Sequence, residues 1–192
     1  MTRRRRIAAI VGGVAVVGAI AWGVSRGLER FVRPRPAQTS PAATAAAPTA
    51  HITATLYYAS QNGDSLVAVR REVPLAEGIV AQGRQIVAAQ LEPAPTPYAS
   101  VIPTGTSLRA FYVTERGEAF VDLSGQISSG HPGGSLTELL TVYALVNTVT
   151  ANLPAVQRVQ ILVEGKEVDT IAGHVDVRRP LQTDLSLVVE SQ

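Results

Sequence analysis

The sequence of 192 residues contains no cysteine. Disulfide bonds, thiolate metal ligands and a lipid-bearing cysteine are therefore excluded. From residue 51 onward the chain also contains no GxSxG sequence of a nucleophile elbow, no Ser-x-x-Lys pair and no glycine-rich phosphate loop. Because no group of residues has the spacing of a catalytic, metal or cofactor site, we expect no cofactor and predict that the protein is not an enzyme.

Basic residues are in the minority in the second part of the chain. Residues 3–35 hold 8 of the 17 basic residues and a single acidic one, whereas residues 51–192 hold 9 basic and 14 acidic residues, a net charge of 9 − 14 = −5. A domain that binds nucleic acid needs a basic surface. We therefore expect no nucleic acid among its partners.

The chain begins with a long uncharged segment. Arginines at residues 3–6 precede 18 uncharged residues, 7–24, which as a helix would extend about 27 Å, close to the ~30 Å hydrocarbon core of a bilayer. This predicts one membrane-spanning helix within residues 1–33, with its N-terminus in the cytoplasm. The alternative is a signal peptide cleaved near Ala21, which would release a secreted protein. The length of the apolar run favours the uncleaved anchor.

Residues 34–50 contain four prolines, seven alanines and no acidic residue. Such a composition cannot form a hydrophobic core and favours extended conformations. We expect this segment to be a linker that holds a domain, residues 51–192, outside the cytoplasm.

Residues 51–192 have the pattern of an α+β domain. Apolar residues alternate from Ile52 to Tyr58, and Asn62-Gly63 marks a hairpin turn. The same reasoning predicts further strands at residues 66–73, 108–114, 119–123, 156–163, 168–177 and 184–190, a helix at 74–91, and a second helix that Pro154 ends. We expect one domain of two hairpins, two helices and C-terminal strands, in which an antiparallel or mixed sheet carries both helices on one face.

The second helix begins with a candidate capping box, Ser135 and Glu138. No charged residue occurs from Leu139 to Gln157. At helical spacing, one face contains the expected core residues Leu136, Leu139, Leu140, Tyr143 and Val146. The opposite face contains small, weakly polar residues that are easily desolvated, and these are the candidate interface residues: Thr137, Thr141, Leu145, Thr148 and Asn152. Either this face packs within the domain, or it binds a second protomer or another envelope protein.

A few side chains are of types that bind metals or take part in catalysis, but they lack the neighbours that a metal or catalytic site requires. His174 and Asp176 fall on one face of a predicted strand, but no third metal ligand is spaced to join them. Ser124, Ser128 and Ser129 precede His131 in a turn that suits a helix entry equally well. Asp122 and Glu138 would form a carboxylate pair only if the turn between them brought them together.

Several segments resemble the GerMN family, which is named after a bacterial protein of sporulation and germination. They occur in the family's order: Leu56-Tyr57-Tyr58 with the Asn62-Gly63 turn, Ile102-Pro103-Thr104-Gly105-Thr106-Ser107-Leu108, Ala119-Phe120-Val121-Asp122-Leu123-Ser124, Gly134-Ser135, and Val159-Gln160-Ile161-Leu162-Val163-Glu164-Gly165-Lys166. The resemblance implies an extracytoplasmic domain similar to the ring-building modules of secretion and sporulation assemblies, associated with the cell envelope and peptidoglycan. It supplies no catalytic residues.

Together these features predict a membrane-anchored, envelope-facing binding or assembly module. Its expected partners are the membrane through the N-terminal helix, peptidoglycan or an envelope protein, and a second copy of itself. The alternative is an enzyme that acts on peptidoglycan, or the accessory subunit of one.

Overall fold

The computed structural model of the protein describes residues 50–189. The predicted membrane helix and nearly all of the predicted linker lie outside these residues. Within the described range, no helix combines the length and the apolar character that crossing a bilayer requires.

The described residues form an α+β domain with two sheets. The elements, in chain order, are β1 (His51–Ala59), β2 (Leu66–Pro74), α2 (Ile79–Leu91), β3 (Leu108–Val113), β4 (Glu118–Leu123), α3 (Gln126–Ser129), α4 (Ser135–Asn152), β5 (Arg158–Val163), β6 (Lys166–Glu167) and β7 (Val188–Val189). One sheet has the order β1-β2-β7 and the other β3-β4-β5-β6. Both predicted hairpins are confirmed, since β1 pairs with β2 and β3 with β4 in antiparallel register.

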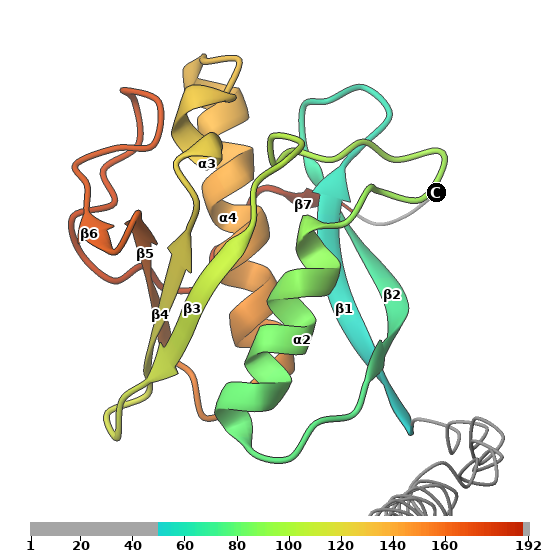
Figure 1. Ribbon diagram of the computed structural model, residues 1–192. Coiled ribbons are helices and arrows are strands. Elements are labelled where there is room, and N and C mark those ends of the chain that lie inside the picture. Colours follow the sequence, from blue (N-terminus) through green and yellow to red (C-terminus); the bar gives the residue numbers. More distant parts are fainter. Residues whose placement is uncertain (1–49, 190–192) are drawn as a thin grey trace, which may run out of the picture. The chain divides into compact units, whose positions relative to one another are not determined.

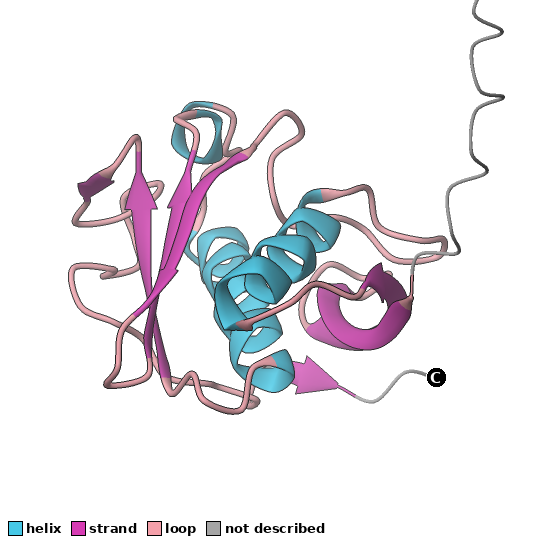
Figure 2. Ribbon diagram, turned by 60° about the horizontal axis from the view of Figure 1, so that its bottom comes forward, coloured by secondary structure: helices cyan, strands magenta, loops and turns pink. Residues whose placement is uncertain are grey.

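Helices α2 and α4 lie between the two sheets, as Figures 1 and 2 show from two directions. Helix α4 contacts β1 on one side and β5 on the other, while α2 contacts β3, β1 and β2. The prediction of a single sheet with both helices on one face is therefore wrong. The first hairpin forms a sheet of its own instead of joining the second, and the parallel pairing of β4 with β5 is made possible by α4 as the crossover between them.

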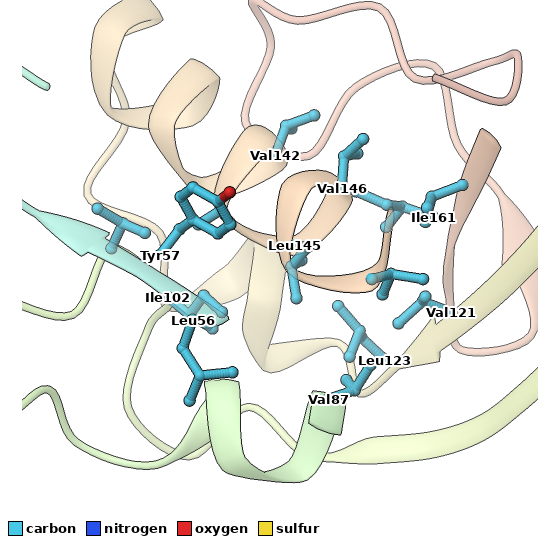
Figure 3. Close-up of a cluster of buried hydrophobic side chains, with 14 of the residues drawn as sticks. Leu56, Tyr57, Val87, Ile102, Val121, Leu123, Val142, Leu145, Val146 and Ile161 are labelled. Atoms are coloured by element: carbon cyan, nitrogen blue, oxygen red, sulfur yellow. The ribbon is translucent and has the colours of Figure 1, made fainter. Parts of the chain in front are cut away.

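Because it has a sheet on either side, α4 is buried around most of its circumference. Its residues Val142, Leu145 and Val146 are fully buried, in a cluster that also contains Leu56 of β1 and Ile161 of β5 (Figure 3). Burying each large aliphatic side chain contributes about 1.5–3 kcal/mol, so this helix is the largest single source of core stability.

The C-terminal segments contain less strand than expected. Residues 168–177 were predicted as a strand but form bends and irregular backbone, and of the described residues 184–189 in the second predicted strand, only Val188–Val189 belongs to a sheet. The side chain of Gln160 holds the first of these segments by donating to the carbonyl of Val177 at 2.7 Å. The backbone of Leu181 then exchanges hydrogen bonds with Val159. These contacts place residues 170–175 over the first turns of α4.

Candidate functional site

The candidate interface residues of α4 lie inside the domain. Thr141, Leu145 and Thr148 have no exposed surface, and Thr137 and Asn152 are partly buried. The prediction that these residues form an accessible face is therefore wrong. Strand β1, helix α2 and the segment around Val101 cover this side of the helix, so the alternative of packing within the domain is the one that the structure shows.

Two amide side chains close the free edge of β1. Asn152 accepts from the backbone N–H of Thr55 at 2.8 Å and donates to the carbonyl of the same residue at 2.7 Å. Gln90 of α2 forms the same pair of bonds with Tyr57, at 3.0 and 2.7 Å. Thr148 completes the arrangement by donating to Gln90 Oε1 at 2.7 Å. The polar residues of the helices thus replace the backbone of a missing neighbouring strand.

Asn147 does the same for the C-terminal segment. Its side chain donates to the carbonyl of Asp184 at 2.7 Å and accepts from the N–H of Asp184 at 3.0 Å. Gln90, Asn147 and Gln160 were missed as structural residues by the sequence analysis. One feature of the sequence could have identified them: each is an uncharged amide within an otherwise apolar run of residues. A polar side chain that is buried in such a run requires a hydrogen-bond partner.

Glu138 is a fully buried carboxylate at the start of α4. The N-cap of this helix is Gly134 and no side chain caps it, so the predicted capping box is wrong. Instead, Glu138 Oε1 accepts from the backbone N–H groups of Ile171 and Ala172, both at 2.8 Å. Its Oε2 accepts from the N–H of His174 at 2.8 Å and lies 3.2 Å from Nδ1 of the same residue. One carboxylate therefore organises the loop of residues 170–175.

These contacts keep Glu138 charged. Burial raises the pKa of a carboxyl group, but the backbone N–H groups of the loop oppose this effect and hold the pKa of Glu138 below its ordinary value of 4.5. A buried carboxylate is tolerated only when its lone pairs are used in this way.

His131 lies beside this group in the turn before α4. Its Nδ1 accepts from the N–H of Gly133 at 3.0 Å, so the proton is on Nε2, which is 3.1 Å from Thr141 Oγ1. Thr141 Oγ1 in turn donates to the carbonyl of Val101 at 2.6 Å. The chain of bonds requires a neutral imidazole, because a proton on Nδ1 would face the N–H of Gly133.

This requirement predicts a pH dependence of stability. Burial lowers the pKa of His131 below its ordinary value of 6.5; the charge of Glu138 opposes that shift and His174 adds to it. Below pH 6.5, His131 therefore binds a proton more readily in the unfolded chain than in the folded protein. Neutral His131 contributes fully to the stability of the fold above that pH, and this contribution is lost as the pH falls. We expect the free energy of unfolding to decrease from about pH 7 to about pH 5, and to decrease less in His131→Asn, which can still accept from Gly133. Denaturant unfolding across this range measures both slopes, and equal slopes would contradict the assignment.

The two pairs of ionisable residues that the sequence suggested, His174 with Asp176 and Asp122 with Glu138, do not form, because their members bond other residues. Asp176 bonds Arg178 at 3.0 and 2.6 Å and not His174. Asp122 accepts from Arg109 at 3.2 Å and from the N–H of Gly165 at 2.7 Å. Within residues 50–189, no group of three histidine or acidic side chains is placed to hold a metal ion. The oxygens of Glu138 are used instead to hold the loop of residues 170–175 on α4.

Known proteins share this fold. The chain is similar to a candidate lipoprotein from Clostridium perfringens, with 20% identity over 69% of this chain and 87% of that one and a TM-score of 0.50. It is similar to the tandem GerMN domains of the sporulation protein GerM from Bacillus subtilis, with 20% identity over 70% of this chain and 46% of that one and a TM-score of 0.55. For the first GerMN domain of that protein the identity is 18%, the coverage 69% and 96%, and the TM-score 0.51. A comparison with curated proteins finds no match.

The family comparison is more specific than these structural similarities. The model of the family Germane, described as sporulation and spore germination, matches residues 55–169. The match runs from β1 past β6 and ends just before the loop that binds Glu138, so that loop lies beyond the matched region. Because the matched region is more than half of the chain, this protein belongs to the Germane family.

Proposed function

We propose that the protein is a binding or assembly module of the bacterial cell envelope, anchored in the membrane by its N-terminal helix and without catalytic activity. The observation that carries the non-catalytic part of this proposal is the use of Glu138, whose oxygens accept three backbone N–H groups and lie in contact with one histidine ring. A general acid or base must exchange its proton with a substrate. A carboxylate saturated by its own loop is instead a structural group.

The family and the anchor support the envelope as the site of action. Relatives in this fold include a sporulation protein and a candidate lipoprotein. An uncharged N-terminal run preceded by arginines supports a single membrane span with the domain outside the cytoplasm. On this basis the partner is peptidoglycan or a protein of the envelope.

The proposal is tested with the full-length chain in detergent micelles and purified cell-wall sacculi. We expect the chain to sediment with the sacculi and to release no soluble muropeptides, which chromatography of the supernatant measures, with a muramidase as the positive control. Release by the chain would overturn the non-catalytic assignment and favour a peptidoglycan-active enzyme. Absence of both release and sedimentation would exclude peptidoglycan as the partner, and cross-linking in intact cells would then test for an envelope protein.

A further inference from the structure

The two edges of the β1-β2-β7 sheet are treated differently. From Thr55 to Ala59 the edge of β1 is closed, because Thr55 and Tyr57 bond the amides of Asn152 and Gln90, and Ala59 exchanges backbone bonds with Ala99. In an antiparallel pair, backbone groups alternate between the two sides of a strand. The residues of β1 that bond β2 are therefore the intervening ones, such as Leu56, which pairs with Val69.

By the same alternation, Arg70 and Glu72 direct their N–H and C=O groups toward the outer edge of β2. As far as residues 50–189 are concerned, this edge is closed at both ends: β7 pairs with Leu66 and Val67, and Gln82 donates to the carbonyl of Pro74 at 3.2 Å. Between these ends, no segment within residues 50–189 pairs with Arg70 or Glu72. Both side chains are exposed on the outer face of the sheet. An open strand edge of this kind is a template for pairing with another strand.

The charges on this edge match a second copy of the same edge. Two β2 strands that pair antiparallel about Arg71 place Arg70 of each copy opposite Glu72 of the other, and opposite charges in this position are stabilising. A register centred on Arg70 would instead place the two Arg70 side chains opposite each other, which is destabilising. In the register about Arg71 the two Arg71 side chains also lie opposite each other, but on the other face of the sheet, where each pairs with Glu92 of its own copy at 3.0 Å. The favourable register uses the two residues whose backbone groups are open and avoids the ends closed by β7 and Gln82.

We propose that the outer edge of β2 binds the same edge of a second copy of this chain. The two sheets then form one continuous sheet across a two-fold axis at Arg71, with Arg70 and Glu72 exchanging backbone hydrogen bonds and charge across the interface. This inference deepens the proposed function, since it rests on the assembly role and names the copy itself as one partner.

Charge reversal tests the pairing in the full-length chain in detergent micelles. We expect wild type to form a dimer by sedimentation equilibrium, and we expect Arg70→Glu and Glu72→Arg each to weaken it roughly tenfold, because each places like charges opposite each other twice across the axis. The double variant should restore the dimer. Arg116→Glu, an equal change of charge in the exposed β3–β4 turn, is the matched control and should leave the dimer unchanged. Thermal unfolding of each variant shows that the fold is intact.

Cysteine pairs test the register, since the natural chain has none. Opposite residues in a hydrogen-bonded antiparallel pair have Cα atoms about 5.5 Å apart, within the range of a disulfide. A mixture of Arg70→Cys and Glu72→Cys chains should therefore form a disulfide-linked dimer on oxidation, and Arg70→Cys alone should not. A monomeric wild type, or single reversals without effect, would overturn the inference. Sedimentation of the chain with sacculi would be unaffected by that outcome, so the proposed function would be judged separately.

Discussion

Glu138→Gln is expected to destabilise the domain by roughly 3 kcal/mol, because glutamine has the size of glutamate but keeps only one acceptor oxygen. Its amide nitrogen would face backbone N–H groups of residues 171–174 that now donate to the carboxylate at 2.8 Å. The amide oxygen can serve either the donors on one side of the present carboxylate or those on the other, so at least one N–H group of the loop would lose its acceptor. For a domain of this size, the loss corresponds to a fall in melting temperature of roughly 10 °C, measured by thermal denaturation followed by circular dichroism.

Glu164→Gln is the matched control. Glu164 also accepts from a backbone N–H, that of Gly125 at 2.6 Å, and pairs with Arg109 at 2.9 Å, but its side chain is 52% exposed. Water replaces the lost bonds there, so we expect a change of at most about 1 kcal/mol. Equal effects of the two substitutions would show that the carboxylate of Glu138 has no special role in holding the loop.

The carboxylate of Glu138 also makes the stability of the domain depend on pH in the acidic range. The pKa of Glu138 is below its ordinary value of 4.5 in the folded protein, so its contribution is complete above that pH and is lost as the pH falls through the lower, folded value. The difference in stability between wild type and Glu138→Gln should therefore become smaller as the pH decreases below 4.5.

Local patterns were sufficient to predict the hairpins. The Asn62-Gly63 turn and the alternation on either side of it depend on neighbours in sequence, and β1 and β2 lie close to where the sequence places them. The strand predicted at residues 156–163 was likewise found as Arg158–Val163. Such elements can be predicted from short stretches of sequence, because the type of a turn and the alternation of apolar residues in a strand depend on a few adjacent residues.

The surroundings of α4 could not be predicted in the same way. Assigning one face to the core and the opposite face to solvent assumes a single covering layer, but this helix has a sheet on each side. Leu136, expected in the core, is 44% exposed, whereas Thr148, expected at the surface, is buried. The second covering layer comes from β1 and β2, which are more than sixty residues earlier in the chain. The spacing of apolar residues within α4 therefore gives no indication of this layer.

Glu138 was misassigned for a related reason. A serine followed three residues later by glutamate is typical of a capping box. The actual partners of Glu138 are backbone groups of residues 171–174, and backbone donors have no side-chain signature in a sequence. Only the folded chain shows that this acidic residue, the single one between Asp122 and Glu164, is buried.

Gly83→Leu is expected to destabilise the domain by about 3 kcal/mol through overpacking. A glycine within a helix costs about 1 kcal/mol relative to alanine, so its presence in α2 indicates that a neighbour packs closely. The neighbour is the ring of Phe111 in β3, which is fully buried; a Cβ at Gly83 would lie 2.5 Å from its Cζ and 2.9 Å from its Cδ1. The contact lies where α2 packs against β3, so a larger side chain at residue 83 would have to displace the buried ring. The denaturant midpoint measures the loss.

Ala88→Leu controls for adding the same side chain to the same helix, at an exposed position, and should change the stability by less than about 0.5 kcal/mol. A second comparison tests the mechanism. Gly83→Ala should be destabilising when Phe111 is present and neutral or stabilising when Phe111→Leu has made room, because alanine is then free to exert its higher helix propensity. If Gly83→Leu were as stable as Ala88→Leu, the close contact between α2 and β3 would not limit the residue at position 83. If Gly83→Ala behaved alike with and without Phe111, the aromatic ring would not be the cause.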